Sequence, residues 1–181
     1  TKTQMSKRVQ LYILIGMLTS FNSYAMKIPS DIDSMAITTF YANNSIDLNR
    51  VENPDLYFEV YRWLGKPYKL GGNSMQGVDC ANFVKRMYRD AYNKNIDGNA
   101  VSMFPLCSTL QSVDMAAEGD LVFFKINNSS ITHVGIYLQH GKFAHATIHN
   151  GVMISDISES YYQQYLYKAG RPEAEGVYAV E

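Results

Sequence analysis

The spacing of apolar residues changes about halfway along the chain, and the first half has helical spacing. One apolar run follows Asn53-Pro54, a pair typical of a helix start, and ends at Gly65, which predicts a helix over 54–64. A second run predicts a helix over about 80–93. Its apolar face repeats at three- and four-residue steps, at Phe83, Val84, Met87, Tyr88 and Ala91.

The second half has the shorter runs of apolar and aromatic residues that are typical of strands. We expect strands over about 120–126, 132–138, 143–148 and 152–157, with hairpin turns at His140-Gly141 and Asn150-Gly151. The residues between the two halves, 98–113, are expected to form a connecting loop. A short helix over 160–167 and a last strand or loose tail over 176–180 complete the chain. Helices followed by an antiparallel meander predict an α+β domain, with N-terminal helices packed on an antiparallel β-sheet.

The N-terminal residues have the pattern of a secretory signal peptide. Lys7 and Arg8 follow Met5, an apolar stretch covers 9–18, and Ser23-Tyr24-Ala25 supplies the small residues of a cleavage site. The apolar stretch is shorter than the roughly 20 residues that a membrane-spanning helix needs. We therefore expect residues 1–25 to be a signal peptide with extra residues before Met5. The rest of the chain divides into an arm over 26–52 with a short helix near 35–41, a main domain over 53–171, and a tail over 172–181.

Cleavage near Ala25 predicts an exported protein that is periplasmic or secreted. No cysteine comes directly after that site, so we expect no lipid anchor and no stable attachment to a membrane. The chain has 181 residues with 46% hydrophobic and 18% charged, which fits one globular domain and a monomer. The formal net charge of −1 provides no basic field for nucleic acid.

The two cysteines, Cys80 and Cys107, are too few for a disulfide-built scaffold. Export permits a bridge between them, but a bridge would block the chemistry that Cys80 can perform. We interpret Cys107 as a small buried apolar residue. The sequence has neither a CxxC nor an HExxH motif, so we expect no metal and no cofactor.

Cys80 lies at the start of a predicted helix, directly after Asp79. Free N–H groups at a helix start favour an anion, which predicts a lowered pKa for the Cys80 thiol. The same N–H groups can stabilise the oxyanion formed when a thiolate attacks an amide. The alternative is an ordinary buried cysteine, and Cys80 alone does not decide between the two.

Two histidines on neighbouring predicted strands provide the groups that such a nucleophile needs. A hairpin at 139–141 makes His133 and His145 cross-strand or diagonal neighbours on one face of the sheet. One imidazole can then remove the thiol proton, while the second group fixes the tautomer of the first. The alternative is two histidines satisfied within a sheet. That alternative applies to His140 and His149, which lie in turns and are expected to be solvated.

Five segments with these residues resemble, in order, the motifs of the NlpC/P60 cell-wall hydrolases. They are GKPYKLGG (65–72), VDCANFV (78–84), EGDLVFF (118–124), THVGIY (132–137) and FAHA (143–146). The resemblance covers about 54–171. It implies a papain-like fold, with Cys80 as nucleophile, His133 as base and His145 as the third, orienting residue.

The resemblance also gives roles to two residues near the nucleophile. Tyr68 matches a tyrosine that faces the thiol in many members and contributes to substrate or oxyanion binding; a core aromatic residue is the alternative. Asp79 matches the acid before the nucleophile, and capping the helix can be its whole role. The chain differs from the family pattern at Ala81-Asn82, where Ser-Gly or Ser-Ala is usual, and at Glu118, where proline is usual. The first difference predicts an altered substrate preference.

The family's substrate is the stem peptide of peptidoglycan, and the bond commonly cut is the γ-D-glutamyl–diamino acid bond. The resemblance therefore implies an exported cysteine endopeptidase. Three alternatives stay open: an interbacterial effector with the same chemistry and an immunity partner, a non-catalytic binding module, and an amidase or acyltransferase acting on another amide or a lipid.

Overall fold

The computed structural model describes residues 34–127, 129–173 and 176–180. The expected signal peptide and its cleavage near Ala25 lie outside the described residues. The described helices are α1 (Ser34–Asn43), α2 (Pro54–Trp63), α3 (Cys80–Tyr92), α4 (Ala100–Met103) and α5 (Ser160–Tyr165). The short 3-10 turns are Leu48–Arg50, Phe104–Leu106 and Val113–Met115.

Six strands form one antiparallel sheet in the order β4-β9-β5-β6-β7-β8. Their bounds are β4 Cys107–Thr109, β5 Leu121–Phe124, β6 His133–Tyr137, β7 Lys142–Thr147, β8 Gly151–Asp156 and β9 Leu166–Pro172. The predicted meander is present as β5 to β8, and β9 then returns to pair with the other edge of β5. Two small pairs lie apart from this sheet: β1 (Asn73–Ser74) with β2 (Gly77–Val78), and β3 (Lys94–Ile96) with β10 (Val177–Ala179).

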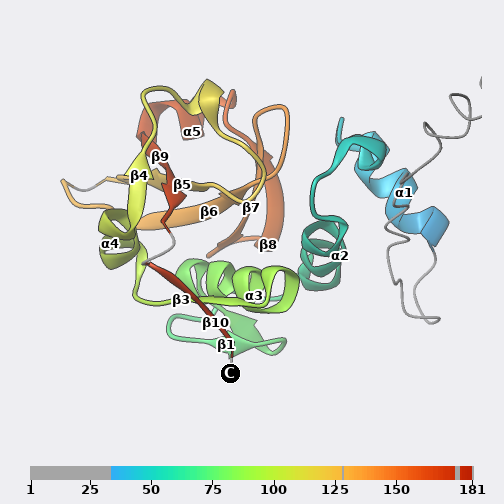
Figure 1. Ribbon diagram of the computed structural model, residues 1–181, viewed down its shortest axis with the longest axis horizontal. Helices are drawn as coiled ribbons and strands as arrows, with labels where there is room; N and C mark the ends of the chain where they lie inside the picture. The colour runs from blue at the N-terminus through green and yellow to red at the C-terminus, as the bar shows by residue number, and fades with distance from the viewer. Residues whose placement is uncertain (1–33, 128, 174–175, 181) are drawn as a thin grey trace, which may run out of the picture.

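Helices cover both faces of the six-stranded sheet. All four residues of β5 are buried, with Leu121 and Phe123 in the cluster shared with α2 and α3, and Val122 and Phe124 in the cluster that includes α5. Alternate residues of a strand point to opposite faces, so the sheet is a central layer. Figure 1 shows α3 and α5 on opposite sides of it. The expectation of helices packed on an antiparallel sheet is confirmed.

The two longest predicted helices are confirmed at their expected positions. The Asn53 side chain accepts a hydrogen bond from the Asp55 N–H, and Pro54 occupies the first turn of α2. The helix ends before Gly65, which has a φ of +71°. Just after it, the Gly65 N–H donates to the Val152 carbonyl at 2.8 Å, which fixes this end of α2 against β8.

The expected helix near 35–41 is present as α1. It packs on α2, where the rings of Tyr41 and Tyr57 lie 5.3 Å apart and the Tyr41 hydroxyl donates to the Tyr57 carbonyl. Ile37 and Tyr41 are fully buried in the same cluster as α2 and α3. The described part of the arm is therefore integrated into the core. No helix among the described residues is long and apolar enough to cross a membrane.

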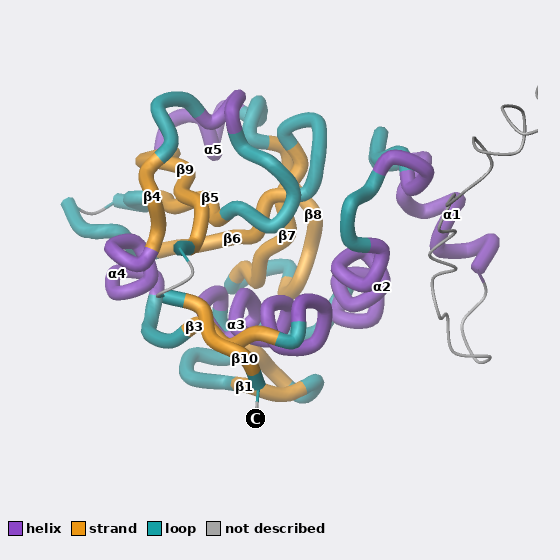
Figure 2. Tube along the Cα trace, viewed as in Figure 1, coloured by secondary structure: helices purple, strands orange, loops and turns teal. Residues whose placement is uncertain are grey.

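The expectation of a plain loop over 98–113 is wrong, because this segment holds α4 and β4. An Asn99–Ser102 capping box begins α4, although the helix is too short to show a helical period. β3 and β9 were not expected either, and β10 forms the strand that 176–180 allowed. Figure 2 shows β3 and β10 beside α3, apart from the main sheet. These strands form by pairing with distant segments, so their own sequences indicate them weakly.

Candidate active site

Cys80 is the first residue of α3, and Asp79 caps that helix. The Asp79 carboxylate accepts hydrogen bonds from the N–H of Asn82 at 2.7 Å and from the N–H of Gly71 at 2.8 Å. Asp79 thus holds both the helix start and the preceding loop. This is the capping role that the sequence allowed. The Cys80 side chain is almost enclosed, and the residue is 8% exposed.

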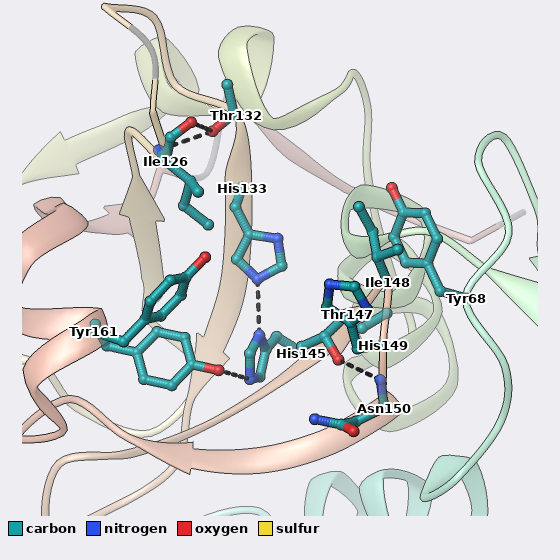
Figure 3. A pocket seen from close by; sticks show the side chains of 12 residues that line it. Tyr68, Ile126, Thr132, His133, His145, Thr147, Ile148, His149, Asn150 and Tyr161 are labelled. Carbon is teal, nitrogen blue, oxygen red and sulfur yellow. Dashed lines mark hydrogen bonds between the residues drawn. The ribbon is translucent and has the colours of Figure 1, made fainter.

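His133 on β6 and His145 on β7 form a direct pair. His133 Nε2 lies 2.7 Å from His145 Nδ1, and Figure 3 shows the two rings pointing toward one another. The observed register pairs Ile136 with Ala144, which makes the two histidines diagonal neighbours on one face. The prediction that they share a face is confirmed. Both are buried, whereas His140 and His149 are exposed, as expected.

The thiol of Cys80 lies beside the strand that carries His133. The backbone N–H of Val134, the next residue along β6, acts on the Cys80 thiol and lowers its pKa. Among the described residues, no hydrogen bond joins Cys80 Sγ to the His133 ring, and His133 Nδ1 has no hydrogen-bond partner. Catalytic contacts are often loose before substrate binds. The structure thus brings the two predicted residues to one place, with Nδ1 as the unused ring nitrogen.

Burial controls the charge state of the site. It raises the pKa of the Cys80 thiol, and the Asp79 charge adds to this, although the N–H groups of Val134, Ala81 and Cys80 act in the opposite direction. The expectation that the helix start gives Cys80 a lowered pKa is therefore wrong, because desolvation outweighs the N–H groups. Burial also lowers the pKa of His133 to about 4 and the pKa of His145 well below its ordinary value. At neutral pH the thiol and both imidazoles are uncharged.

Tyr68 reaches the same place from the segment after α2. Its pKa is raised by partial burial and then by electrostatic repulsion from Cys80 and Asp79. Tyr68 pairs with Val78 in an isolated bridge, so its backbone is fixed beside the start of α3. Tyr68 is half-buried: it packs against the main core cluster and also lines a pocket.

A pocket of about 450 Å³ opens beside the two histidines. Its lining contains tyrosines from two sides and the 147–150 turn, and Figure 3 shows Tyr68 and Tyr161 on opposite sides of His133 and His145. Cys80 is not in this lining. The pocket therefore borders the histidine pair. The lining residues are Tyr68, Ile126, Thr132, His133, His145, Ala146, Thr147, Ile148, His149, Asn150, Tyr161 and Tyr162.

Two hydroxyl groups lie next to His145 Nε2, and the sequence did not predict either of them. His145 Nε2 lies 2.9 Å from Ser155 Oγ and 3.4 Å from the Tyr162 hydroxyl, and those two oxygens are 3.1 Å apart. Ser155 is 3% exposed and Tyr162 is 8% exposed. One feature of the sequence could have indicated Ser155: it is a serine within the apolar predicted strand 152–157. The hairpin register pairs His145 with Met153, so Ser155 is a diagonal neighbour of His145.

The unusual residues at 81 and 82 have defined surroundings. Ala81 is buried, and the Asn82 amide donates to the Gly72 carbonyl at 3.0 Å and to the Asp79 carboxylate at 3.2 Å. Asn82 therefore ties α3 to the loop before β1. Glu118 accepts hydrogen bonds from the N–H groups of Glu52 and Asn53 and from the Tyr57 hydroxyl, which links its loop to the start of α2.

Cys107 is free and buried, and its thiol donates to the Met103 carbonyl at 3.4 Å. The interpretation of Cys107 as a small core residue is confirmed. Cys80 is also free. Within the described ranges, no group of three or more His, Cys, Asp or Glu side chains could hold a metal ion.

A thiol at a helix start beside a buried histidine pair defines the class of a candidate cysteine hydrolase. Comparison with known proteins places the chain more narrowly: the NlpC/P60 family model matches residues 65–171. A probable endopeptidase of Haemophilus influenzae is 34% identical over 114 residues, which is 62% of this chain and 70% of that protein. The chain belongs to the NlpC/P60 family.

Two further relatives extend the comparison. The Escherichia coli K12 murein DD-endopeptidase MepS/murein LD-carboxypeptidase is 31% identical over 127 residues, covering 68% of this chain and 66% of that protein. The crystal structure of the NlpC/p60 domain of the peptidoglycan hydrolase SagA matches 64% of this chain and 95% of that chain, with a TM-score of 0.55 and 26% identity. The expectation of a papain-like α+β fold is confirmed.

Proposed function

We propose that this protein is an exported cysteine endopeptidase that hydrolyses peptide bonds in peptidoglycan stem peptides. The observation that carries the proposal is the position of the Cys80 thiol at the start of α3, against the strand that presents the His133–His145 pair. The names of the relatives, which include murein and peptidoglycan endopeptidases, support the substrate class.

The proposed reaction begins from uncharged groups. The Cys80 sulfur attacks the carbonyl carbon of the scissile amide, while its proton passes to His133 Nδ1. The oxyanion that forms is stabilised by the backbone N–H of Cys80, which has no partner within its own helix, and by the Tyr68 hydroxyl. Collapse of this intermediate breaks the C–N bond, and the His133 proton leaves with the amine.

The second half of the reaction regenerates the enzyme. A water molecule gives a proton to His133 Nδ1 and attacks the thioester carbon. Breaking the C–S bond releases the acid product, and the proton returns to Cys80. His145 orients the His133 ring throughout, since His133 Nε2 is bound to His145 Nδ1.

The bond that we propose is the γ-D-glutamyl–diamino acid bond of a single stem peptide. A second candidate is the D,D bond of a cross-link between two stems, which the name of the Escherichia coli relative favours. Mass spectrometry of digested peptidoglycan separates the two. The first bond releases free dipeptide ends from individual stems, whereas the second converts cross-linked dimers to monomers of unchanged stem length.

The experiment that tests the activity compares the parent protein with Cys80→Ala on purified peptidoglycan. The parent should release soluble peptide fragments, and Cys80→Ala should release none. Cys107→Ala is the matched control, since Cys107 is buried away from the histidines, and it should keep its activity. Fragment release by Cys80→Ala equal to that of the parent would falsify the assignment. Peptidoglycan binding without release by the parent would favour a non-catalytic module.

A further inference from the structure

The histidine pair continues beyond His145 into two hydroxyl groups, Ser155 on β8 and Tyr162 on α5. Ser155 Oγ lies 2.9 Å from His145 Nε2, and the Tyr162 hydroxyl lies 3.1 Å from Ser155 Oγ and 3.4 Å from the same nitrogen. Both residues come from elements that follow the five family-like segments in the chain. Neither hydroxyl has a place in the reaction proposed above.

The surroundings of these hydroxyls are apolar. The Phe143 ring lies 4.5 Å from the His145 ring and 5.0 Å from the Tyr162 ring, and Phe124 lies 5.7 Å from Tyr162. A ring N–H that is buried among aromatic rings has a large cost unless it finds an acceptor. Among the described residues, the hydroxyls of Ser155 and Tyr162 are the acceptors within reach of His145 Nε2.

Only one proton can lie between His133 Nε2 and His145 Nδ1, because both rings are neutral. If His133 carries it, His145 Nδ1 accepts, and the His145 proton must be on Nε2, facing Ser155 and Tyr162. His133 Nδ1 is then a free lone pair. In the opposite arrangement the second proton of the pair is on His133 Nδ1, which has no hydrogen-bond acceptor among the described residues. Ser155 Oγ donates its one proton to the Tyr162 hydroxyl, so toward His145 Nε2 it can only accept, and the first arrangement is favoured.

We infer that Ser155 and Tyr162 are positioning residues that together accept the His145 Nε2 proton and so keep His133 Nδ1 unprotonated for use as the base. This inference rests on the proposed function for its catalytic meaning. Each hydroxyl is within reach of the same nitrogen, at 2.9 and 3.4 Å, so either one can act when the other is lost. The pair of oxygens is therefore a redundant acceptor.

Redundancy gives a specific kinetic expectation. Ser155→Ala and Tyr162→Phe remove one oxygen atom each, and each should lower kcat by only twofold to fivefold with KM unchanged. The double variant leaves His145 Nε2 without an acceptor, and kcat should fall by about a hundredfold, more than the product of the two single losses. Ser155→Thr combined with Tyr162→Phe retains a hydroxyl and should recover most of that loss. Tyr165→Phe is the control: Tyr165 is on the same helix, but its hydroxyl binds Asn127.

Nitrogen-15 NMR of the imidazole rings tests the inference without any activity assay. In the Cys80→Ala protein, both His133 and His145 should carry their proton on Nε2 at pH 7. In the same background, the double variant should show the proton on Nδ1 of both rings. Rings that carry their proton on Nδ1 in the Cys80→Ala protein overturn the inference, and this result does not require that the double variant folds. Unchanged ring tautomers in a folded double variant, or single losses that simply multiply, also overturn it. A parent protein that releases no peptide contradicts the proposed function instead.

Discussion

Cys80 should be a neutral thiol in the free protein near pH 7, and the pH dependence of its alkylation rate should show this. Burial raises the pKa of the thiol above its ordinary value of 9, and burial holds the pKa of His133 at about 4. With a thiol pKa above 9, less than about 1% of the sulfur is thiolate at pH 7. No preformed thiolate–imidazolium pair is expected, because that pair requires the thiol pKa to lie below the imidazole pKa.

The assay is the alkylation of Cys80 by iodoacetamide, an uncharged reagent, between pH 5 and pH 9. The protein carries Cys107→Ala, so that a single thiol reports. Since only thiolate reacts, the rate should rise about tenfold for each pH unit, without a plateau below pH 9. From pH 6 to pH 8 the rise is about a hundredfold by the same relation.

Two controls make the result decisive. His133→Asn should give the same slope, because the free thiol is not paired with an imidazolium. Cys80→Ala with Cys107 retained should react more slowly still, since burial raises the pKa of Cys107 to about 12. A rate that is flat from pH 5 to pH 8 in the parent, and that becomes steep in His133→Asn, would mean a preformed ion pair and would refute the reasoning.

Three further predictions concern stability and local charge. Asp79→Ala should lower the free energy of unfolding in urea by about 1–2 kcal/mol through loss of the α3 cap, and it should speed alkylation of Cys80 because the Asp79 charge raises that pKa. Gly151→Ala should cost at least about 2 kcal/mol in thermal unfolding, since φ is +67° and the new Cβ would lie 2.2 Å from the Lys66 carbonyl oxygen; an unchanged Tm contradicts this. His133 has a lower pKa in the folded than in the unfolded protein. Its contribution to the free energy of unfolding should therefore be fully present above pH 6.5 and lost as the pH falls toward 4. Over that pH range the free energy of unfolding in urea should therefore fall by up to about 3 kcal/mol more in the parent than in His133→Asn. If the two proteins lose stability in parallel as the pH falls, this prediction is wrong.

The sequence predicted the parts of the fold that have a local signal. The caps at Asn53 and Asp79, the period of α3 and the hairpin turns all act over a few residues, and all are present. β9 has no such signal, because Lys168, Gly170 and Arg171 interrupt its apolar residues. It is a strand because it pairs with β4 on one side and β5 on the other. Pairing between distant segments is not visible in a local pattern.

The same distinction applies to the site. His133 and His145 are joined by one hairpin, so their contact follows from the register. The pKa of Cys80 does not follow from its place at a helix start, because it depends on how deeply β6 and its neighbours bury the thiol. Ser155 and Tyr162 come from two different elements, and their convergence on one nitrogen requires the packing of α5 against the sheet.

The neutral state of the site follows from burial, and the third residue supplies no charge that would offset it. A carboxylate bound to His133 Nε2 would stabilise an imidazolium, raise the pKa of the ring and favour proton transfer from the thiol before substrate arrives. His145 provides no charge, and its own partners are two hydroxyls in an aromatic environment. The low pKa of His133 and the high pKa of Cys80 both have burial as their largest cause, and His145 does not counter it. In the reaction that we propose, the charge appears only during the attack on the amide, when the oxyanion forms near the start of α3 and the imidazolium forms beside it. Stabilisation is then directed to the transition state and not to the free enzyme.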